Sequence, residues 1–447
     1  GPEVLRGLGV AATLFLVQSA CCGVARAQAT KTFIDYIQPT PITCSPLSSE
    51  TWGVSEVLPR DVCNGIEGAR GAGVPPEYYF WDGAVVRAQD GTFHLFGSFW
   101  PGTTDFSPGW WSSDAFHAKS TGGVLGPYEL QGYAYDNGPN SSYPHRGHNV
   151  SATELPDGTY ALVVSEVVPF TIFTSSSLDG PWENRGHITI DTNGVPVSIP
   201  FPGEQNLESN VSLVVRHDGD FQIVQRHGII AISTTGLLGP YLVQQPTTTY
   251  PASEAVPPSL ASIFPNRQTH LSPVGPSSVE DTYVLAEDPA IWYSGGQYHV
   301  VYNYPSDRVA YHLTSPDGIH DWTDRGLAYD PRLAERLFAY EGDSTINRWY
   351  KMERPDVIME NGHITHVSFA VSDVDKNDQI PANSNHGSKI VVVPFDGIAF
   401  DAETGIGGSG GAGGAGGGGD SGAGAGGGDA AGGSRGSAGT GTGGTLS

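Results

Sequence analysis

Five segments of the chain share one alternation of apolar and polar positions. Each has a short apolar run, a two-residue turn that contains glycine, and a second run in which apolar and polar residues alternate. Asp-Gly and Asn-Gly turns between such runs are strong signals of a β-hairpin. The pattern therefore predicts five hairpins, and few stretches show helical periodicity. The hairpins are predicted over residues 81–98, 148–165, 209–226, 287–303 and 353–370.

A second repeated pattern follows the first four hairpins. It consists of Ser or Thr, a turn, and Gly-Pro before an aromatic residue, with His-Asp-Trp as the variant in the fourth copy. A turn of this kind presents an aromatic side chain and starts another strand, so each unit holds three or four strands. The copies are centred on Pro127, Pro181, Pro240 and Asp321.

Repeated units of this size predict an all-β fold, a five-bladed β-propeller with four-stranded antiparallel blades, over residues 75–403. A pair of β-sandwiches is the alternative, but it does not predict five like hairpins. We expect the segment TFIDYIQPTPI, residues 32–42, to close the propeller by pairing with the last blade.

The two ends of the chain differ in composition from the repeats. Residues 1–29 combine Arg6, an apolar run and a small-residue cleavage site, which is typical of a secretory signal too short to span a membrane. A lipid attachment at Cys21 is the alternative. Residues 404–447 are rich in Gly, Ala and Ser and are predicted to form a disordered tail. We therefore expect a secreted or cell-surface bacterial protein.

Residues 30–74 form a predicted N-terminal segment with one pair of cysteines. Cys44 and Cys63 are the two cysteines that remain outside the signal segment. Exported proteins meet an oxidising environment, so a structural disulfide between the two is expected.

The net charge of −25 narrows the range of partners. A phosphate backbone would be repelled by this surface, so no nucleic acid is expected. No further apolar run is long enough to cross a bilayer, so no membrane-spanning segment is expected either. A neutral ligand, or one matched by arginine, fits the composition better, and the oligomeric state is not predicted.

Candidate functional residues stand at the starts of the predicted inner strands. In a propeller these strands line a central channel, so polar side chains at their starts converge at one mouth. Acidic residues are poor sheet formers, and their use here indicates that they point towards the axis. The alternative is that they cap turns. The positions are Asp82, Asn149, Asn210, Glu287 with Asp288, and Glu353 with Arg354.

The segments EDPAIWYSGGQYHVVYN and WDGAVVRAQDGTFHLFGS resemble the five-bladed glycosidase superfamily, which includes glycoside hydrolase families 43, 62, 32, 68 and 117. The resemblance covers residues 75–400. It implies that Glu287 is the general acid and Asp82 the general base. A third carboxylate is expected where this chain has Asn210, with Glu208 two residues earlier. This departure, and Gly83 where family 43 usually has proline, indicate a sister family.

The segment RGHNVSATELPDG also resembles a Gly-His-Asn segment of family 43 that lies near the axis. The resemblance implies substrate contacts for His145, Arg146, His148 and Asn149. The sequence does not decide whether a calcium or sodium ion binds in the channel. No other metal or cofactor is expected, because the sequence has no Cys/His zinc spacing and no Asp-rich calcium loop.

The segment KMERPDVIMENGHITHVSFA supplies two further candidates. Glu353 is a second candidate acid. Arg354 has the geometry to bind a uronate carboxylate or a sulfate through two hydrogen bonds, and a salt bridge to a neighbouring acid is its alternative role. Trp81 and other aromatic residues near the first blade suit sugar stacking as well as blade packing.

Cleavage of a glycosidic bond needs one protonated carboxyl and one ionised carboxylate. Asp288 beside Glu287 would raise the pKa of the acid by repulsion. The sequence therefore predicts a secreted glycoside hydrolase that acts on a plant or algal polysaccharide or oligosaccharide. A polysaccharide lyase that uses His148 and Arg146 on a uronate is one alternative, and a non-catalytic carbohydrate-binding propeller is another.

Overall fold

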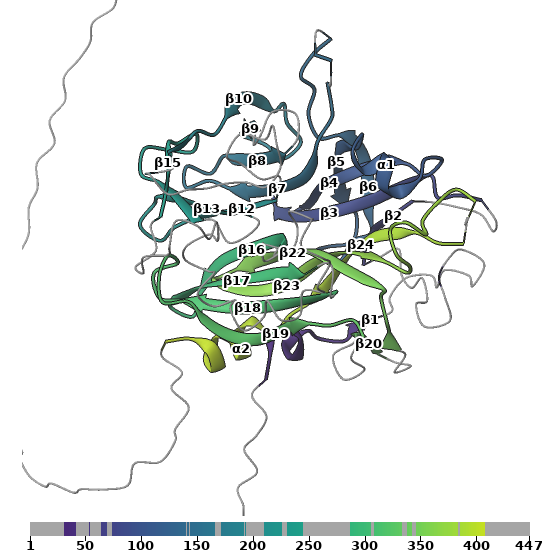
Figure 1. Ribbon diagram of the computed structural model, residues 1–447. Helices are drawn as coiled ribbons and strands as arrows, with labels where there is room; N and C mark the ends of the chain where they lie inside the picture. Colours follow the sequence, from purple (N-terminus) through teal and green to yellow (C-terminus); the bar gives the residue numbers. More distant parts are fainter. Residues whose placement is uncertain are drawn as a thin grey trace, which may run out of the picture. The chain divides into compact units, whose positions relative to one another are not determined.

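Five antiparallel β-sheets, which we call blades 1 to 5 in chain order, make up most of the structure (Figure 1). The chain is represented by a computed structural model. The expected signal segment, Cys44, Cys63, Glu208 and the tail from residue 407 lie outside the described residues. The described residues are 31–41, 53, 64–68, 74–139, 141–142, 144–165, 171–191, 193, 210–225, 230–244, 287–304, 308–332, 338–341, 346–382 and 385–406.

The first three blades are each built from consecutive strands. Blade 1 contains β3 (Tyr78–Arg87), β4 (Phe93–Pro101), β5 (Asp114–Ser120) and β6 (Tyr128–Tyr133). Blade 2 contains β7 (His148–Glu154), β8 (Tyr160–Ser165), β9 (Thr171–Ser175) and β10 (Glu183–His187). Blade 3 contains β12 (Val211–Val215), β13 (Phe221–Gln225), β14 (Ile230–Ser233) and β15 (Tyr241–Val243), with β11 (Ile190–Asp191) added in parallel at its edge.

The last two blades differ in how their outer strands are supplied. Blade 4 contains β16 (Glu287–Ser294), β17 (Gln297–Tyr304), β18 (Val309–Ser315) and β19 (Thr323–Tyr329). Blade 5 contains β22 (Lys351–Glu360), β23 (His363–Ser372) and β24 (Ser388–Pro394), and its fourth strand is β2 (Gly65–Glu67) from the N-terminal side.

The five inner strands close into a circle. β3, β7, β12, β16 and β22 contact one another in this order, and β22 contacts β3 again. Apolar side chains fill the space between each pair of successive blades, so every blade is buried on both faces. The fold is the predicted five-bladed β-propeller.

The two sequence repeats correspond to two kinds of turn. Each predicted hairpin joins the first and second strands of a blade, and the second residue of its turn is a glycine with φ from 80° to 90°. The Gly-Pro-aromatic segments and their His-Asp-Trp variant join the third and fourth strands of blades 1 to 4. Blade 5 lacks this turn because its fourth strand comes from elsewhere in the chain.

Closure of the propeller differs from the prediction. The strand that pairs with β24 is Gly65–Glu67. The expected segment instead forms the 3₁₀-helix η1 (Phe33–Tyr36), a bridge from Ile37 to Phe395, and the short strand β1 (Thr40–Pro41), which pairs with β20 (Phe338–Glu341). A carboxylate oxygen of Asp35 accepts a hydrogen bond from the Thr32 backbone N–H at 2.6 Å, and this contact favours a helical turn over a strand.

The helical elements lie at the edges of the blades. Phe33 of η1 packs against Trp292, Phe395 and Phe400, and Phe400 belongs to α2 (Gly397–Thr404). The short helix α1 (Phe106–Trp110) follows β4. A small separate sheet contains β1 (Thr40–Pro41), β20 (Phe338–Glu341) and β21 (Ile346–Asn347). Among the described residues, no helix has the length and apolar character needed to cross a membrane.

Candidate functional site

One residue near the start of each inner strand occupies an equivalent position, and we call these five residues the axial ring. The strand pairing of blades 1, 2, 4 and 5 is interrupted at this position by a bulge. Four of the five residues have φ between 51° and 67°, a conformation that Asn and Asp adopt more readily than most residues. The axial ring consists of Asp82, Asn149, Asn210, Asp288 and Arg354.

The Arg354 side chain connects blade 5 to three other blades. Its Nε lies 3.0 Å from Asp82 Oδ1 of blade 1, and its Nη1 lies 3.3 Å from Asp288 Oδ1 of blade 4. Nη1 also donates a hydrogen bond of 2.7 Å to Asn210 Oδ1 of blade 3. All four side chains are buried, so the charges interact with little screening by water. Arg354 therefore occupies the centre of the axial ring.

Asp82 is enclosed by these contacts and is 0% exposed. Its Oδ2 accepts a hydrogen bond from the Ser98 hydroxyl and another, of 3.3 Å, from the Val150 backbone N–H. The resemblance described above implies that Asp82 and Glu287 act together as general base and general acid. In the structure Asp82 shares Arg354 with Asp288, the residue that follows Glu287.

Glu353, which precedes Arg354, forms a second charged group beside the axial ring. Its Oε1 lies 3.1 Å from Lys351 Nζ, and its Oε2 pairs with Lys376 Nζ. Lys376 follows β23, and its Nζ lies 4.5 Å from the centroid of the Trp81 ring on β3. We call Glu353, Lys351 and Lys376 the glutamate–lysine cluster.

The surroundings shift the pKa values of two neighbouring carboxyls, Asp288 and Glu353, in opposite directions. Burial raises the pKa of Asp288, and although Arg354 opposes this shift, the charge of Glu353 adds to it. Burial would also raise the pKa of Glu353, but Lys376 and Lys351 outweigh it and lower that pKa below its ordinary value. General acid–base chemistry uses a pair of carboxyls whose surroundings shift their pKa values in opposite directions.

Glu287 lies at the edge of this site. It is the first residue of β16, is partly exposed and pairs with Asn303 of β17. Burial opposes a high pKa at Lys376, but Glu353, then Asp288 and then Glu287 raise it, which places Glu287 near the glutamate–lysine cluster.

Trp81 and His148, two residues predicted to contact the substrate, are buried beside the axial ring. Trp81 packs against Phe106 and is covered by Lys376. The His148 ring lies 4.4 Å from that of Trp110 and 5.9 Å from that of Trp111, and Trp111 is exposed. Trp111 is therefore the exposed aromatic surface nearest to His148 among the described residues.

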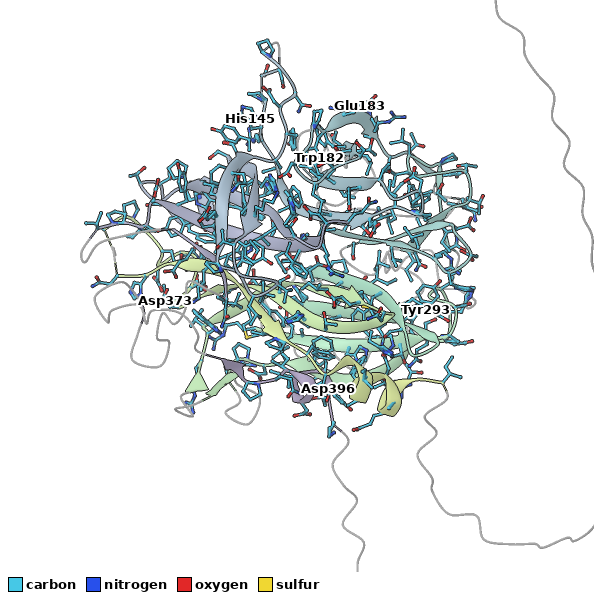
Figure 2. All side chains as sticks on the ribbon, turned by 180° about the vertical axis from the view of Figure 1, so that it is seen from behind. His145, Trp182, Glu183, Tyr293, Asp373 and Asp396 are labelled. Atoms are coloured by element: carbon cyan, nitrogen blue, oxygen red, sulfur yellow. The ribbon has the colours of Figure 1, made fainter. Side chains whose placement is uncertain are left out.

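The predicted cluster between His145 and Asn149 is divided by the fold. His145, which is labelled in Figure 2, stacks on Tyr133 of the outer strand β6 with the ring centroids 3.8 Å apart. Its Nδ1–H donates to the Tyr135 carbonyl at 2.9 Å. The Arg146 guanidinium donates to the Trp111 carbonyl. His148 and Asn149 instead belong to the inner strand β7. His145 and Arg146 are thus placed against blade 1, outside the axial ring.

The residues of the axial ring do not fit a resident calcium or sodium ion. A hard cation requires several oxygen ligands directed at one point. Here the point between Asp82 and Asp288 is taken by the guanidinium of Arg354, which already neutralises them.

Lys351, Lys376 and Ser98 were not among the residues predicted from the sequence. Lys376 lies between β23 and β24, in a segment without a recognisable motif, and reaches the site only because blades 1 and 5 are neighbours. Lys351 lies two residues before Glu353 on the same strand. Because side chains alternate between the two faces of a strand, this spacing would have placed Lys351 on the same face as Glu353.

The channel contains a cavity of about 370 Å³, which is lined by residues that follow the axial ring along the inner strands. All five inner strands line it, and Asp356, His217 and Tyr293 supply polar groups. Burial raises the pKa of Asp356 to about 7, although the Val357 backbone N–H and Arg354 act against the shift. A weakly acidic carboxyl therefore borders this cavity.

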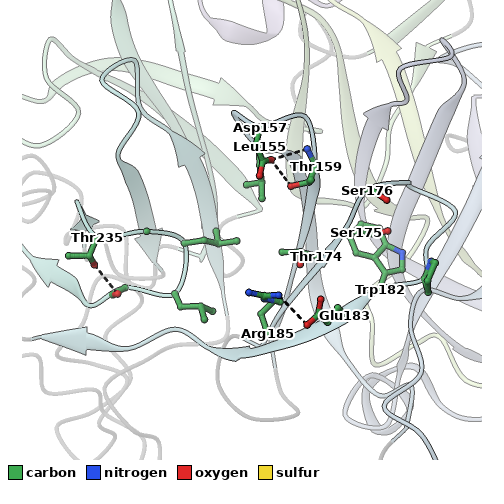
Figure 3. Close-up of a pocket in the computed structure, with 15 residues that line it drawn as sticks. Leu155, Asp157, Thr159, Thr174, Ser175, Ser176, Trp182, Glu183, Arg185 and Thr235 are labelled. Atoms are coloured by element: carbon green, nitrogen blue, oxygen red, sulfur yellow. Dashed lines mark hydrogen bonds and ion pairs between the residues drawn. The ribbon is translucent and has the colours of Figure 1, made fainter. Parts of the chain in front are cut away.

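A second cavity of about 770 Å³ lies between the turns of blades 2 and 3 (Figure 3). It is lined by Trp182, Thr159, the Glu183–Arg185 ion pair and residues 235–239. This cavity is far along the strands from the residues of the axial ring, and it brings together no pair of carboxyls with opposed pKa shifts.

No family model matches the chain, and no curated protein matches it. Solved structures with a similar fold include a glycoside hydrolase with 12% identity and a TM-score of 0.44, which covers 74% of this chain. A thermostable family-43 glycoside hydrolase has 12% identity and a TM-score of 0.41, with 72% of this chain and 91% of that one covered. An exo-β-1,3-galactanase from Phanerochaete chrysosporium has 9% identity and a TM-score of 0.44, with 76% and 65% covered.

The chain spans 61% of the length of the first of these structures. At this identity and TM-score, the likeness does not determine the family of the chain. The assignment as a propeller rests on its own strand order, and its chemistry rests on the side chains described above.

Proposed function

We propose that the protein is an exported glycoside hydrolase that cleaves a plant or algal polysaccharide or oligosaccharide at the axial ring. The observation that supports this is the pair of neighbouring carboxyls, Asp288 with a raised pKa and Glu353 with a lowered one. Hydrolysis of a glycosidic bond uses one group of each kind.

In this proposal Asp288 protonates the oxygen of the leaving sugar. Glu353 is the ionised carboxylate that activates water or stabilises the developing positive charge. Asp82 acts as a positioning residue, because it holds Arg354, which in turn contacts Asp288. Glu287 and Trp111 would contact sugar at the mouth of the channel, where they are exposed in part or in full.

The test is the release of reducing sugar from a panel of plant and algal polysaccharides that includes β-1,3-galactan. Asp288→Asn and Glu353→Gln should each lower turnover by about 10²-fold or more, because each removes a proton-transfer group. Circular dichroism of each variant checks that the propeller is retained.

Glu360→Gln is the matched control for Glu353→Gln. Glu360 is the last residue of the same strand, far from the axial ring, and its replacement should leave turnover unchanged. Full activity in both Asp288→Asn and Glu353→Gln would refute the proposal. Products with the ultraviolet absorbance of an unsaturated uronate would indicate a lyase instead.

The enclosure of Asp82 favours a second candidate, a carbohydrate-binding propeller without turnover. Asp82 is 0% exposed, and both of its carboxylate oxygens are engaged within the protein. In this case the protein should retain oligosaccharides in affinity electrophoresis while releasing no product during long incubation.

A further inference from the structure

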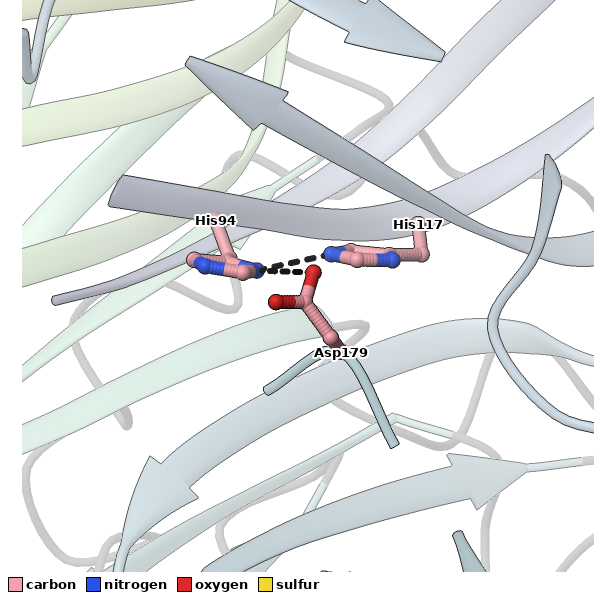
Figure 4. Close-up of side chains that lie close together, drawn as sticks. All are labelled: His94, His117 and Asp179. Atoms are coloured by element: carbon pink, nitrogen blue, oxygen red, sulfur yellow. Dashed lines mark hydrogen bonds and ion pairs between the residues drawn. The ribbon is translucent and has the colours of Figure 1, made fainter. Parts of the chain in front are cut away.

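Two histidines and an aspartate meet at the boundary between blades 1 and 2, away from the axial ring (Figure 4). His94 lies on β4 and His117 on β5, whereas Asp179 comes from the turn between β9 and β10. Nδ1 of His94 lies 2.8 Å from Nε2 of His117 and 3.9 Å from Oδ1 of Asp179. Three atoms that are all suitable metal ligands therefore lie within 4.8 Å of one another.

Hydrogen bonds around His94 fix its tautomer. The Thr92 hydroxyl donates to Asp90 Oδ1 at 2.6 Å, so towards His94 Nε2, at 3.2 Å, it can only accept. The ring proton of His94 is therefore on Nε2, and Nδ1 presents its lone pair to His117 and Asp179. A second hydrogen bond that fixes the orientation of a ligating imidazole is a regular feature of protein metal sites.

Burial favours the neutral form of both imidazoles, which is the form that binds a cation. Burial lowers the pKa of His94, and it lowers the pKa of His117 to about 4. Imidazole nitrogen with one carboxylate is a ligand set preferred by zinc and other divalent transition metals over calcium or magnesium.

Blade 4 contains a natural comparison for this arrangement. His299 Nδ1 and His312 Nε2 lie 3.0 Å apart at the corresponding positions of β17 and β18, and the Ser294 carbonyl accepts from His299 Nε2. No carboxylate joins this pair within the described part of the chain. Stacked histidines are thus a packing element of two blades, and Asp179 is what distinguishes the pair in blade 1.

We propose that His94 Nδ1, His117 Nε2 and Asp179 bind a divalent transition metal ion, of which zinc is the expected one, and that this ion links blade 1 to blade 2. Zinc–nitrogen bonds of about 2.0–2.1 Å in a tetrahedral site separate two nitrogens by about 3.3 Å, so the imidazoles have to move apart by about 0.5 Å. The proton on His117 Nε2 moves to Nδ1 through solvent exchange. Because the Asp179 side chain is 56% exposed, water can complete the coordination.

Lys119 is the group that competes with the metal. Its Nζ lies 3.0 Å from Asp179 Oδ2, and this ion pair has to separate when the carboxylate binds a cation. Lys119 is itself part exposed, so its ammonium group can turn to solvent. Removal of Lys119 should therefore tighten metal binding, an effect not expected for zinc held by histidines elsewhere on the surface.

The experiment uses the full chain, stripped of metal with a chelator. Zinc affinity is measured by competition with a chromophoric chelator, and cobalt is added separately to test for the visible absorbance of a tetrahedral site. We expect Asp179→Asn to weaken zinc binding at least about 10-fold, and Lys119→Met to strengthen it. Asp157→Asn, at an exposed turn of blade 2, is the matched control and should bind zinc as the unaltered chain does.

His117→Gln supplies a second test, because glutamine can still donate a hydrogen bond to His94. It should also lose the zinc site while circular dichroism shows a folded propeller, and if it does not fold, Asp179→Asn and Lys119→Met decide. Absence of zinc binding, or an affinity unchanged in both Asp179→Asn and Lys119→Met, would overturn the proposal.

Discussion

Arg354 is the residue whose loss should disturb the axial ring most. In Arg354→Met, Asp82 keeps only hydrogen bonds from Ser98 and Val150, and its buried charge is no longer compensated. We expect the free energy of unfolding to fall by about 3–5 kcal/mol, as is usual when one partner of a buried ion pair is removed. Urea denaturation measures the change.

Arg185→Met is the control for this substitution. Arg185 forms an exposed ion pair with Glu183, and loss of such a pair costs about 1 kcal/mol or less. Equal losses of stability in the two variants would show that Arg354 does not have the structural role described above.

Asp356 should make stability depend on pH. Burial raises its pKa from 3.8 to about 7, so the folded protein holds this proton more tightly than the unfolded chain does. The stability that it contributes is complete below about pH 4, is lost as the pH rises through about 7, and changes no further above that. In Asp356→Asn this loss should be absent.

The measurement is the difference in urea midpoint between Asp356→Asn and the unaltered chain at several pH values. Buried histidines such as His117 and His366 have lowered pKa values, so their titration makes stability rise with pH. Because they titrate in both proteins, this effect cancels in the difference. A difference that stays constant from about pH 4 to about pH 8 would contradict the assignment.

At the scale of single residues, sequence reasoning identified the axial positions but not their partners. Asp82, Asn149 and Asn210 stand at the starts of strands and were found from that position alone. The inner strands of blades 4 and 5 each carry two adjacent polar residues near their starts. Only the bulged strand pairing shows that the second residue of each pair, Asp288 or Arg354, faces the axis. The Lys376 contact depends on the meeting of two blades, which no local pattern encodes.

Gly65 is the glycine on which closure of blade 5 depends. Its φ is 122°, and a Cβ at this position would lie 1.7 Å from the carbonyl oxygen of Ile390. We expect Gly65→Ala to prevent the pairing of β2 with β24 and to lower stability by more than about 1 kcal/mol. Thermal or urea denaturation measures this loss.

Gly132→Ala separates the effect of contact from that of backbone conformation. Gly132 has a φ of 125°, but nothing lies within 4 Å of the point that a Cβ would occupy there. The smaller loss of stability expected in Gly132→Ala is therefore the cost of the backbone alone. Equal losses in the two variants would show that the clash with Ile390 is relieved without opening the blade.

At the scale of elements, turns were more informative than strands. Glycine at the second position of each two-residue turn located five hairpins, because few other residues adopt that conformation. The segment around η1 was expected to close the propeller by pairing with the last blade. Its local capping contacts, and the aromatic pocket formed with α2, favour a helical turn over that pairing.

At the scale of the whole molecule, repetition made the architecture predictable. Five like units can bury both faces of every sheet only if each packs against two neighbours, and a closed circle satisfies this condition for all of them. The chemistry was less predictable, because the axial ring combines side chains from four blades through one arginine. Long-range contacts of this kind leave no spacing in the sequence.

The shared construction of blade 5 has a consequence for synthesis on the ribosome. Val391, the partner of Gly65, follows it by 326 residues. At about 5–20 residues per second, translation takes roughly 15–65 s to produce the second partner after the first has emerged. Until then the nascent chain is an open arc whose first and last blades expose apolar faces, and a chaperone that shields them would act during this interval.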